Sequence, residues 1–128
     1  MRLYAEDPAA DYQPQSGLLT AFEIPAEPGI RVDAGFATGS TVSTFYDAML
    51  AKVIAWAPTR AAAARKLAGV LSRARIHGVT TNRDLLVHVL RDPGFLAGEV
   101  STDRLPQIVA AMPAREPDPG AQIGRAHV

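Results

Sequence analysis

Residues 49–76, "MLAKVIAWAPTRAAAARKLAGVLSRARI", join the two strongest local signals of the sequence. The first nine residues form an apolar run, interrupted by Lys52, which predicts a strand buried on both faces. Pro58 and Thr59 end this run and precede a helical pattern through residue 76, with Gly78 as the stop signal. One face of that helix is expected to be buried, by the spacing of Ala63, Leu67, Val70, Leu71 and Ala74.

The residues before this stretch carry strand signals. Short apolar or alternating runs bounded by Gly and Pro predict strands at residues 2–5, 17–25 and 29–35. Strands first and helices afterwards are typical of an α+β fold. We therefore expect an antiparallel β-sheet in the N-terminal half, followed by packed helices.

The residues after it carry further helix signals. Thr81 and Asp84 stand at capping-box spacing before "LLVHVL", which predicts a second helix. That helix should end at Asp92-Pro93, because the residue before a proline disfavours helical backbone. A shorter helix is expected after Asp103.

Length and composition fit one soluble domain. The chain has 128 residues, 48% of them hydrophobic, which is enough to bury a core. Its formal net charge is zero, so no overall field draws it to nucleic acid or to an anionic membrane. Basic side chains do gather between residues 60 and 91, but a solvated helix surface accounts for them better than nucleic-acid contact does.

The absence of cysteine excludes disulfides and thiolate chemistry, and it is compatible with a reducing compartment. No apolar run approaches the roughly 20 residues that span a bilayer, and "MRLYAEDP" lacks the apolar core of a signal peptide. We expect a cytoplasmic protein without membrane contact.

Residues 1–111 are expected to form one domain. It is expected to be incomplete at its N-terminal edge, because Met1 leads straight into a strand. Residues 112–128 are rich in Pro and Gly and lose apolar periodicity, which predicts a disordered tail. Its last six residues, "IGRAHV", resemble the translation of a sequencing adapter, so residues 123–128 are expected to be artefactual.

Few residues suggest chemistry by themselves. His77, His88 and His127 are scattered without ligand spacing, so no metal site is predicted. Asp47 and Lys52 are five residues apart, and a lysine buried in an apolar strand needs a charged partner. We therefore expect a partly buried ion pair between these two side chains.

Arg31 is the exception, in the alternating stretch "GIRVDAG" at residues 29–35. A guanidinium stays charged at any working pH and offers a fork of donors that matches carboxylate, phosphate or bicarbonate oxygens. An arginine on a strand is more often a surface residue, or pairs with an acid such as the cross-sheet neighbour of Asp33. The residues alone leave both interpretations open.

Three stretches between residues 2 and 105 carry specific motifs: "RLYAEDPAADYQPQSGLLTAFEIP", "GIRVDAGFATGSTVSTFYDAMLAKVIAWAPTR" and "GVTTNRDLLVHVLRDPGFLAGEVSTDRL". The motifs are the "AEDP" turn, "RVDAG", "YDAMLAK" followed by a basic helix, and "GVTTN". Taken in order, these stretches resemble the C-terminal domain of biotin carboxylase, and more narrowly the biotin carboxylase part of acetyl- and propionyl-CoA carboxylase alpha subunits.

The resemblance implies a function for the whole enzyme and a role for Arg31. Enzymes of this family use ATP to activate bicarbonate and then carboxylate the ureido nitrogen of biotin. The arginine at the position of Arg31 is implied to be catalytic and to bind bicarbonate and biotin. Asp47 and Lys52 match family positions too, and they are expected to support the site structurally.

The resemblance also implies what this chain lacks. The ATP-grasp region, which binds ATP and Mg²⁺, has no match here, so the chain should be an inactive fragment by itself. Biotin is implied to reside on a separate carrier domain, and a carboxyltransferase subunit selects the acyl-CoA acceptor. The alternative is a non-catalytic assembly module of the same complex, because this domain helps to form the homodimer in some family members.

Overall fold

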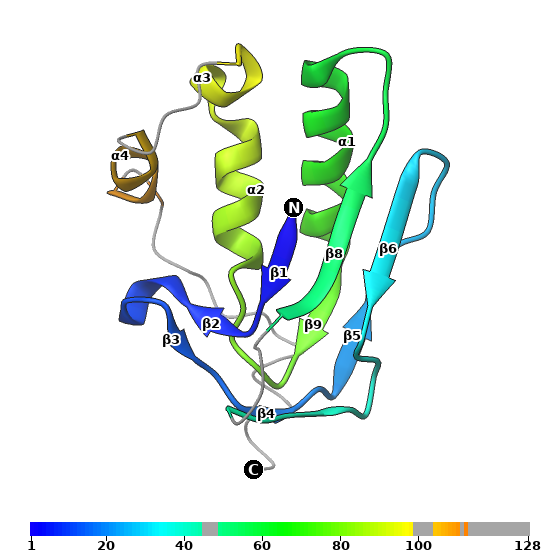
Figure 1. Ribbon diagram of the computed structural model, residues 1–128, viewed down its shortest axis with the longest axis vertical. Coiled ribbons are helices and arrows are strands. Elements are labelled where there is room, and N and C mark those ends of the chain that lie inside the picture. Colours follow the sequence, from blue (N-terminus) through cyan, green and yellow to red (C-terminus); the bar gives the residue numbers. More distant parts are fainter. Residues whose placement is uncertain (45–48, 99–103, 111, 113–128) are drawn as a thin grey trace.

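The computed structural model describes residues 1–44, 49–98, 104–110 and 112. At its centre lies a three-stranded antiparallel sheet in the order β1 (Arg2–Tyr4), β8 (Met49–Ala55) and β6 (Ile30–Ala34). Figure 1 shows β8 between its two partners, with the helices gathered on one side of it. The strand predicted from the apolar run is therefore confirmed as the central strand of this sheet.

The prediction that this strand is buried on both faces is wrong. Val53 is fully buried, but Lys52 is exposed and Trp56, just after the strand, is 72% exposed. Successive side chains of a strand point to opposite faces, and the helices cover only one face here. Among the described residues, the face of β8 that carries Lys52 is the more open one, and Ile54 on it is half-buried.

Three two-stranded ladders, all antiparallel, surround the central sheet. They pair β2 (Glu6–Asp7) with β3 (Gln13–Pro14), β4 (Gly17–Leu18) with β7 (Thr41–Val42), and β5 (Ala21–Glu23) with β9 (Arg75–His77). A short 3-10 helix, η1 (Pro8–Ala10), connects β2 to β3. The strand expected at residues 17–25 is therefore divided into β4 and β5, which pair with different partners.

The first long helix is α1 (Arg60–Arg73). Its start agrees with the sequence, because Thr59 is the N-cap and its side-chain oxygen accepts a hydrogen bond from the Ala62 amide, 3.1 Å away. Its end does not: the predicted helix runs to residue 76, whereas residues 75–77 form β9. The backbone groups of β9 pair with β5, a contact that local periodicity cannot reveal. This strand after α1 also corrects the expected order of strands first and helices afterwards.

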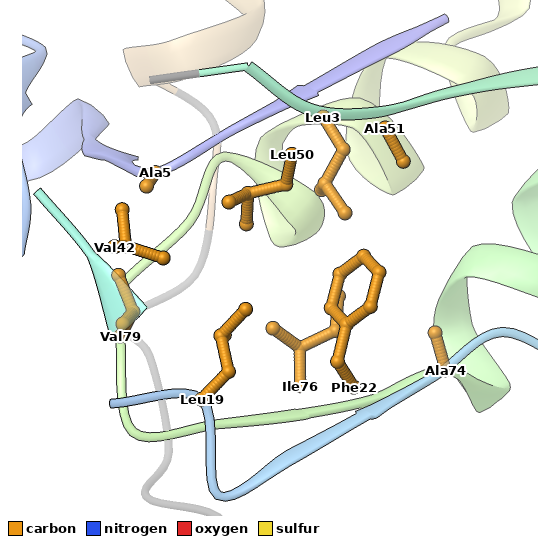
Figure 2. Packing of buried hydrophobic residues seen from close by; sticks show 10 residues of the cluster. All are labelled: Leu3, Ala5, Leu19, Phe22, Val42, Leu50, Ala51, Ala74, Ile76 and Val79. Carbon is orange, nitrogen blue, oxygen red and sulfur yellow. The ribbon is translucent and has the colours of Figure 1, made fainter. Parts of the chain in front are cut away.

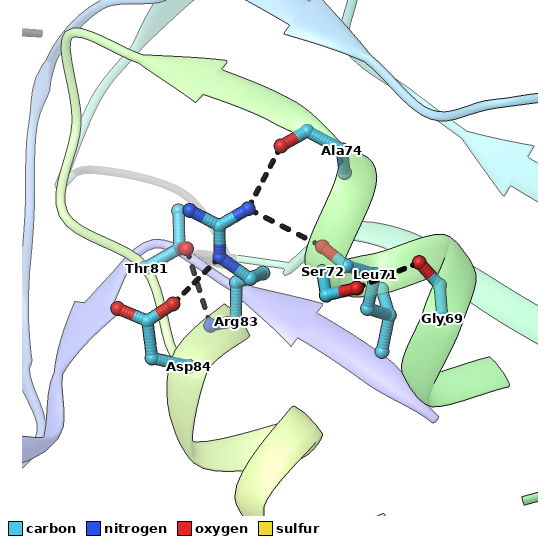
Figure 3. Close-up of polar contacts among 7 residues, drawn as sticks. All are labelled: Gly69, Leu71, Ser72, Ala74, Thr81, Arg83 and Asp84. Carbon is cyan, nitrogen blue, oxygen red and sulfur yellow. Dashed lines mark hydrogen bonds and ion pairs between the residues drawn. The ribbon is translucent and has the colours of Figure 1, made fainter. Parts of the chain in front are cut away.

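The junction between α1 and α2 (Arg83–Arg91) is closed by a half-buried arginine, Arg83. Figure 3 shows the Arg83 guanidinium donating to the carbonyl oxygens of Leu71 and Ala74, at 3.2 and 2.8 Å, while Asp84 accepts from its Nε. These carbonyls lie at the C-terminal end of α1, where the Leu71 carbonyl also accepts from the amide of the C-cap Ala74 at 3.2 Å. Carbonyls at a helix end lack the usual partners from a following turn. Arg83, the first residue of α2, thus binds the carbonyls at the C-terminal end of α1.

The second helix begins at an asparagine rather than at the predicted capping box. The N-cap of α2 is Asn82, only 5% exposed, whose Oδ1 accepts from the Tyr4 amide at 2.8 Å and whose Nδ2 donates to the Arg2 carbonyl at 3.3 Å. Thr81 Oγ1 instead accepts from the Arg83 amide. Asn82 therefore fastens the start of α2 to the outer edge of β1.

Two short helices complete the described chain, α3 (Pro93–Leu96) and α4 (Arg104–Ala110). The predicted end of α2 at Asp92-Pro93 and the predicted helix after Asp103 are both confirmed. The tail predicted at residues 112–128 lies, from residue 113 on, outside the described residues. The coarse fold class, α+β with antiparallel strands, agrees with the structure.

The core has two parts. Figure 2 shows the first, where Leu3 and Leu50 from the central sheet face Leu19, Phe22 and Ile76 from the segments across from it. The second lies between β8, α1 and α2, and its buried members are Val53, Ala64, Leu67, Ala68, Leu71 and Leu90. Helices α1 and α2 lie side by side over this part (Figure 1). Ala63, expected in the buried face of α1, is only half-buried, and Ala64 takes its place.

Candidate functional site

The alternation of β6 divides its side chains between two environments. Ile30 and Val32 point inward and pack against the buried cluster below the helices. Arg31 and Asp33 point to the other side and are exposed. The sequence predicted this alternation, and the structure confirms it. Strand β6 therefore anchors itself through its aliphatic residues and presents its charges on the open face of the central sheet.

Arg31 is held by a neighbour on its own strand. Its Nε donates to Oδ1 of Asp33 at 3.0 Å, and the two side chains are 73% and 45% exposed. The acid that pairs with Arg31 is thus Asp33 itself, and not a residue across the sheet from it. Residues i and i+2 share one face of a strand, so a long arginine side chain can reach back along the strand to such an acid.

The residue across the sheet from Asp33 is Lys52, which is a cation. The expected partial burial of Lys52 is wrong, because its side chain is exposed on the open face. Asp47, its predicted partner, lies outside the described residues, so their ion pair stays a prediction. The physical reason for the error is the same alternation: the apolar neighbours of Lys52 are buried, while Lys52 itself points to solvent.

Arg2 extends this charged row, because it lies opposite Lys52 on the other side of β8. The pKa of the nearby Met1 amino group is lowered, first by burial and then by the positive charges of Lys52 and Arg2. Among the described residues of the three paired strands, the open face thus carries the cations Arg2, Arg31 and Lys52 and the carboxylate of Asp33. An anion is the ligand that such a face attracts. Sequence reasoning placed Asp33 on the same side as Arg31 but missed their pairing, and it missed Arg2, whose position depends on the register of three strands.

The basic segment between residues 60 and 91 is largely engaged within the chain. Five of its basic side chains contact other groups of the described chain: Arg60 lies over the Phe95 ring, Lys66 donates to the Pro28 carbonyl, Arg73 and Arg75 pair with Glu27 and Glu23, and Arg83 binds helix carbonyls. These contacts within the chain account for the five basic side chains without a nucleic-acid partner. They offer no continuous basic stripe for nucleic acid.

An apolar hollow of about 280 Å³ lies on the helix side of the sheet, between Met1, Ala55, Leu67 and Phe95. Its lining contains no carboxylate or histidine, and Arg60 supplies its charge. Among the described residues, no group of three or more His, Cys, Asp or Glu side chains could hold a metal ion. In the same part of the chain, no helix is both long and apolar enough to cross a membrane. The candidate site is therefore the open face around Arg31.

Comparison with known proteins identifies the family. The family model for the biotin carboxylase C-terminal domain matches residues 1–107. Biotin carboxylase 2 of Bacillus subtilis is 41% identical over 107 residues, which are 84% of this chain and 24% of that protein. Pyruvate carboxylase 1 of Caenorhabditis elegans is 40% identical over 118 residues, covering 89% of this chain and 10% of that protein. The chain thus spans a quarter or less of the length of these curated relatives.

A solved structure agrees with this result. The biotin carboxylase domain dimer of the Hydrogenobacter thermophilus 2-oxoglutarate carboxylase, in complex with MgADP, ADP and bicarbonate, is similar with a TM-score of 0.81 and 30% identity. The similarity covers 88% of this chain and 25% of that one. The motifs, the fold and these matches lead to one conclusion: the chain belongs to the biotin carboxylase C-terminal domain family.

Proposed function

We propose that this chain is the C-terminal domain of a biotin carboxylase within a biotin-dependent acyl-CoA carboxylase, and that Arg31 is its catalytic residue. The observation that carries the proposal is the state of Arg31. Its guanidinium is 73% exposed on the open, cationic face of the sheet, and among the described residues it hydrogen-bonds through Nε alone. Its terminal nitrogens make no hydrogen bond to a described residue, and their geometry is suited to bicarbonate or to the ureido oxygen of biotin.

The chemistry assigned to Arg31 is electrostatic. When the ureido nitrogen of biotin loses its proton, negative charge develops on the ureido oxygen. A fixed guanidinium beside that oxygen stabilises the charge, most strongly where a second domain excludes water. Loss of one such donor typically lowers turnover by about 10²–10³.

Further components complete the proposed enzyme. ATP and its Mg²⁺ would be bound mainly by an ATP-grasp region of the same enzyme, and biotin would be presented by a carrier domain. A carboxyltransferase subunit would transfer the carboxyl group to an acyl-CoA. The role of Asp47 and Lys52 as structural support and the cytoplasmic location stay predictions. We expect the 128-residue chain by itself to cleave no ATP.

A chimaera tests the proposal directly. Residues 1–107 of this chain replace the matched part of Bacillus subtilis biotin carboxylase 2, and biotin- and bicarbonate-dependent ATP cleavage is measured. Arg31→Ala should lower kcat by about 10²–10³ without changing sedimentation. The control is Arg65→Ala, which removes an exposed arginine of α1 and should leave kcat unchanged. Full turnover by Arg31→Ala would overturn the catalytic assignment.

One observation favours the assembly module as a second candidate function. Trp56 is 72% exposed just after β8, and large exposed aromatic side chains are enriched at protein–protein interfaces. If the domain acts chiefly in assembly, Trp56→Glu should change the sedimentation of the chimaera, while Arg31→Ala leaves carboxylation intact. If Arg31→Ala abolishes turnover and the oligomer persists, catalysis is the function of this face.

A further inference from the structure

We propose that Asp33 is a positioning residue for Arg31: by accepting from Nε, its carboxylate orients the guanidinium so that the edge formed by the two terminal nitrogens faces the substrate anion. This inference rests on the proposed function of Arg31. It assigns to Asp33 no contact with the substrate. It concerns only how the catalytic side chain is held.

The nitrogen through which Arg31 contacts Asp33 determines which edge of the guanidinium is left for a substrate. The group can bind a carboxylate-like anion along the edge that contains Nε, or along the edge formed by the two terminal nitrogens. The 3.0 Å contact between Nε of Arg31 and Oδ1 of Asp33 occupies the first edge. The terminal edge remains for an anion, so the same guanidinium can bind Asp33 and a substrate oxygen together.

The backbone supports this arrangement. Asp33 and Arg31 lie on one strand whose inward residues, Ile30 and Val32, are half-buried against the core cluster. Both residues are paired in register with β8, Arg31 with Ile54 and Asp33 with Lys52. The backbone that carries the Asp33 carboxylate is therefore held in place by the sheet. A carboxylate held in this way limits the number of rotamers that the exposed Arg31 side chain samples. An exposed ion pair is weak by itself, but it strengthens when a neighbouring domain removes water from the face.

The charges around Asp33 keep the face attractive to anions. Lys52 lies across the sheet from Asp33, and Arg2 lies across from Lys52. The carboxylate can thus hold Arg31 while the face retains an excess of positive charge. A carboxylate beside an anion site also repels an anionic substrate. The hydrogen bond of Asp33 to Arg31 and the electrostatic repulsion by its charge therefore have opposite effects on activity, and substitutions can separate them.

Three substitutions of Asp33 in the chimaera separate positioning of Arg31 from electrostatic repulsion of the substrate. Asp33→Ala removes both the charge and the acceptor, Asp33→Asn removes the charge but keeps an oxygen that can accept from Nε, and Asp33→Glu keeps both. If Asp33 positions Arg31, Asp33→Ala should lower kcat on the order of tenfold, since small misplacements of catalytic groups cost up to about a hundredfold. Asp33→Asn should lose less, and Asp33→Glu should recover most of the activity.

A field effect predicts the opposite pattern. Removal of a negative charge near the anion site should lower the KM for bicarbonate equally in Asp33→Ala and Asp33→Asn, with kcat unchanged. That result would overturn the proposal. The matched control is Glu23→Gln, which breaks the exposed pair between Glu23 and Arg75, 3.5 Å apart on β5 and β9, and should change neither constant.

A second measurement does not depend on turnover. In the 128-residue chain, hydrogen exchange of the Arg31 Nε proton, observed by NMR, should be faster in Asp33→Ala than in the parent and close to the parent in Asp33→Glu. Equal exchange in all three proteins would contradict the contact. The failures are distinguishable: an active Arg31→Ala chimaera defeats the proposed function, whereas an inactive Arg31→Ala with a fully active Asp33→Ala defeats only the positioning role.

Discussion

Arg31 and Arg83 are the same side chain in opposite surroundings. The Arg83 side chain is 16% exposed and donates to two main-chain carbonyls at the end of α1 and to the adjacent Asp84. The Arg31 side chain is 73% exposed and is held by one carboxylate oxygen. A charge that is largely withdrawn from solvent is tolerated where its donors have partners, so the donors of Arg83 serve the structure. The terminal nitrogens of Arg31 make no hydrogen bond to the described residues, so they are available to a ligand, as a binding residue requires.

The largest expected effect concerns the half-buried arginine, Arg83. Arg83→Met keeps the aliphatic stem but leaves the carbonyls of Leu71 and Ala74 without a charged donor. We expect a loss of about 3 kcal/mol in the free energy of unfolding. Urea unfolding of the chain, followed by far-UV circular dichroism, measures it. Arg65→Met on the exposed side of α1 is the control and should stay within about 0.5 kcal/mol of the parent. Equal losses in both variants would refute a special role for Arg83.

An intermediate effect is expected at Asn82. Asn82→Ala removes the acceptor of the Tyr4 amide and the donor to the Arg2 carbonyl in a buried setting, which should cost about 2 kcal/mol. Hydrogen exchange of the Tyr4 amide should quicken in parallel. Gln15→Ala deletes an exposed amide hydrogen bond, to the Gln13 carbonyl, and serves as the comparison with little expected loss. A stable Asn82→Ala variant with a protected Tyr4 amide would show that β1 is held by other contacts.

The smallest expected effect on stability concerns the exposed arginine. Arg31→Met should change the free energy of unfolding by less than about 0.5 kcal/mol, because exposed ion pairs contribute little. The same urea titration measures it beside Arg83→Met. Together with the predicted loss of turnover, this outcome would separate a functional arginine from a structural one. A destabilisation above about 1 kcal/mol would instead place Arg31 among the structural contacts.

Sequence predictions succeeded where a feature depends on neighbouring residues, and they failed where it depends on segments far apart in the chain. The start of α1 at Thr59 was predictable, because an N-cap depends on a few neighbouring residues. Strand β9 was not, since its residues continue the helical periodicity and become a strand through pairing with β5. Lys52 was misjudged because an apolar run does not say which of its faces a helix covers.

The candidate site shows the same division. The alternation around Arg31 and the family motifs indicated that residue from the sequence. Its partner Asp33 was visible two positions away, but its pairing with Nε was decided by side-chain geometry. The contribution of Arg2 required the register of three strands that are distant in sequence.

The sequence by itself determined the family, the two faces of β6, the start of α1 and the end of α2, because motifs, alternation and capping are local properties. Tertiary structure decided which face of β8 is open, where α1 ends and how each arginine is used. Those features depend on desolvation and on hydrogen bonds between segments far apart in the chain, such as Asn82 with Tyr4. The physical difference between Arg31 and Arg83 exists only once the chain is folded.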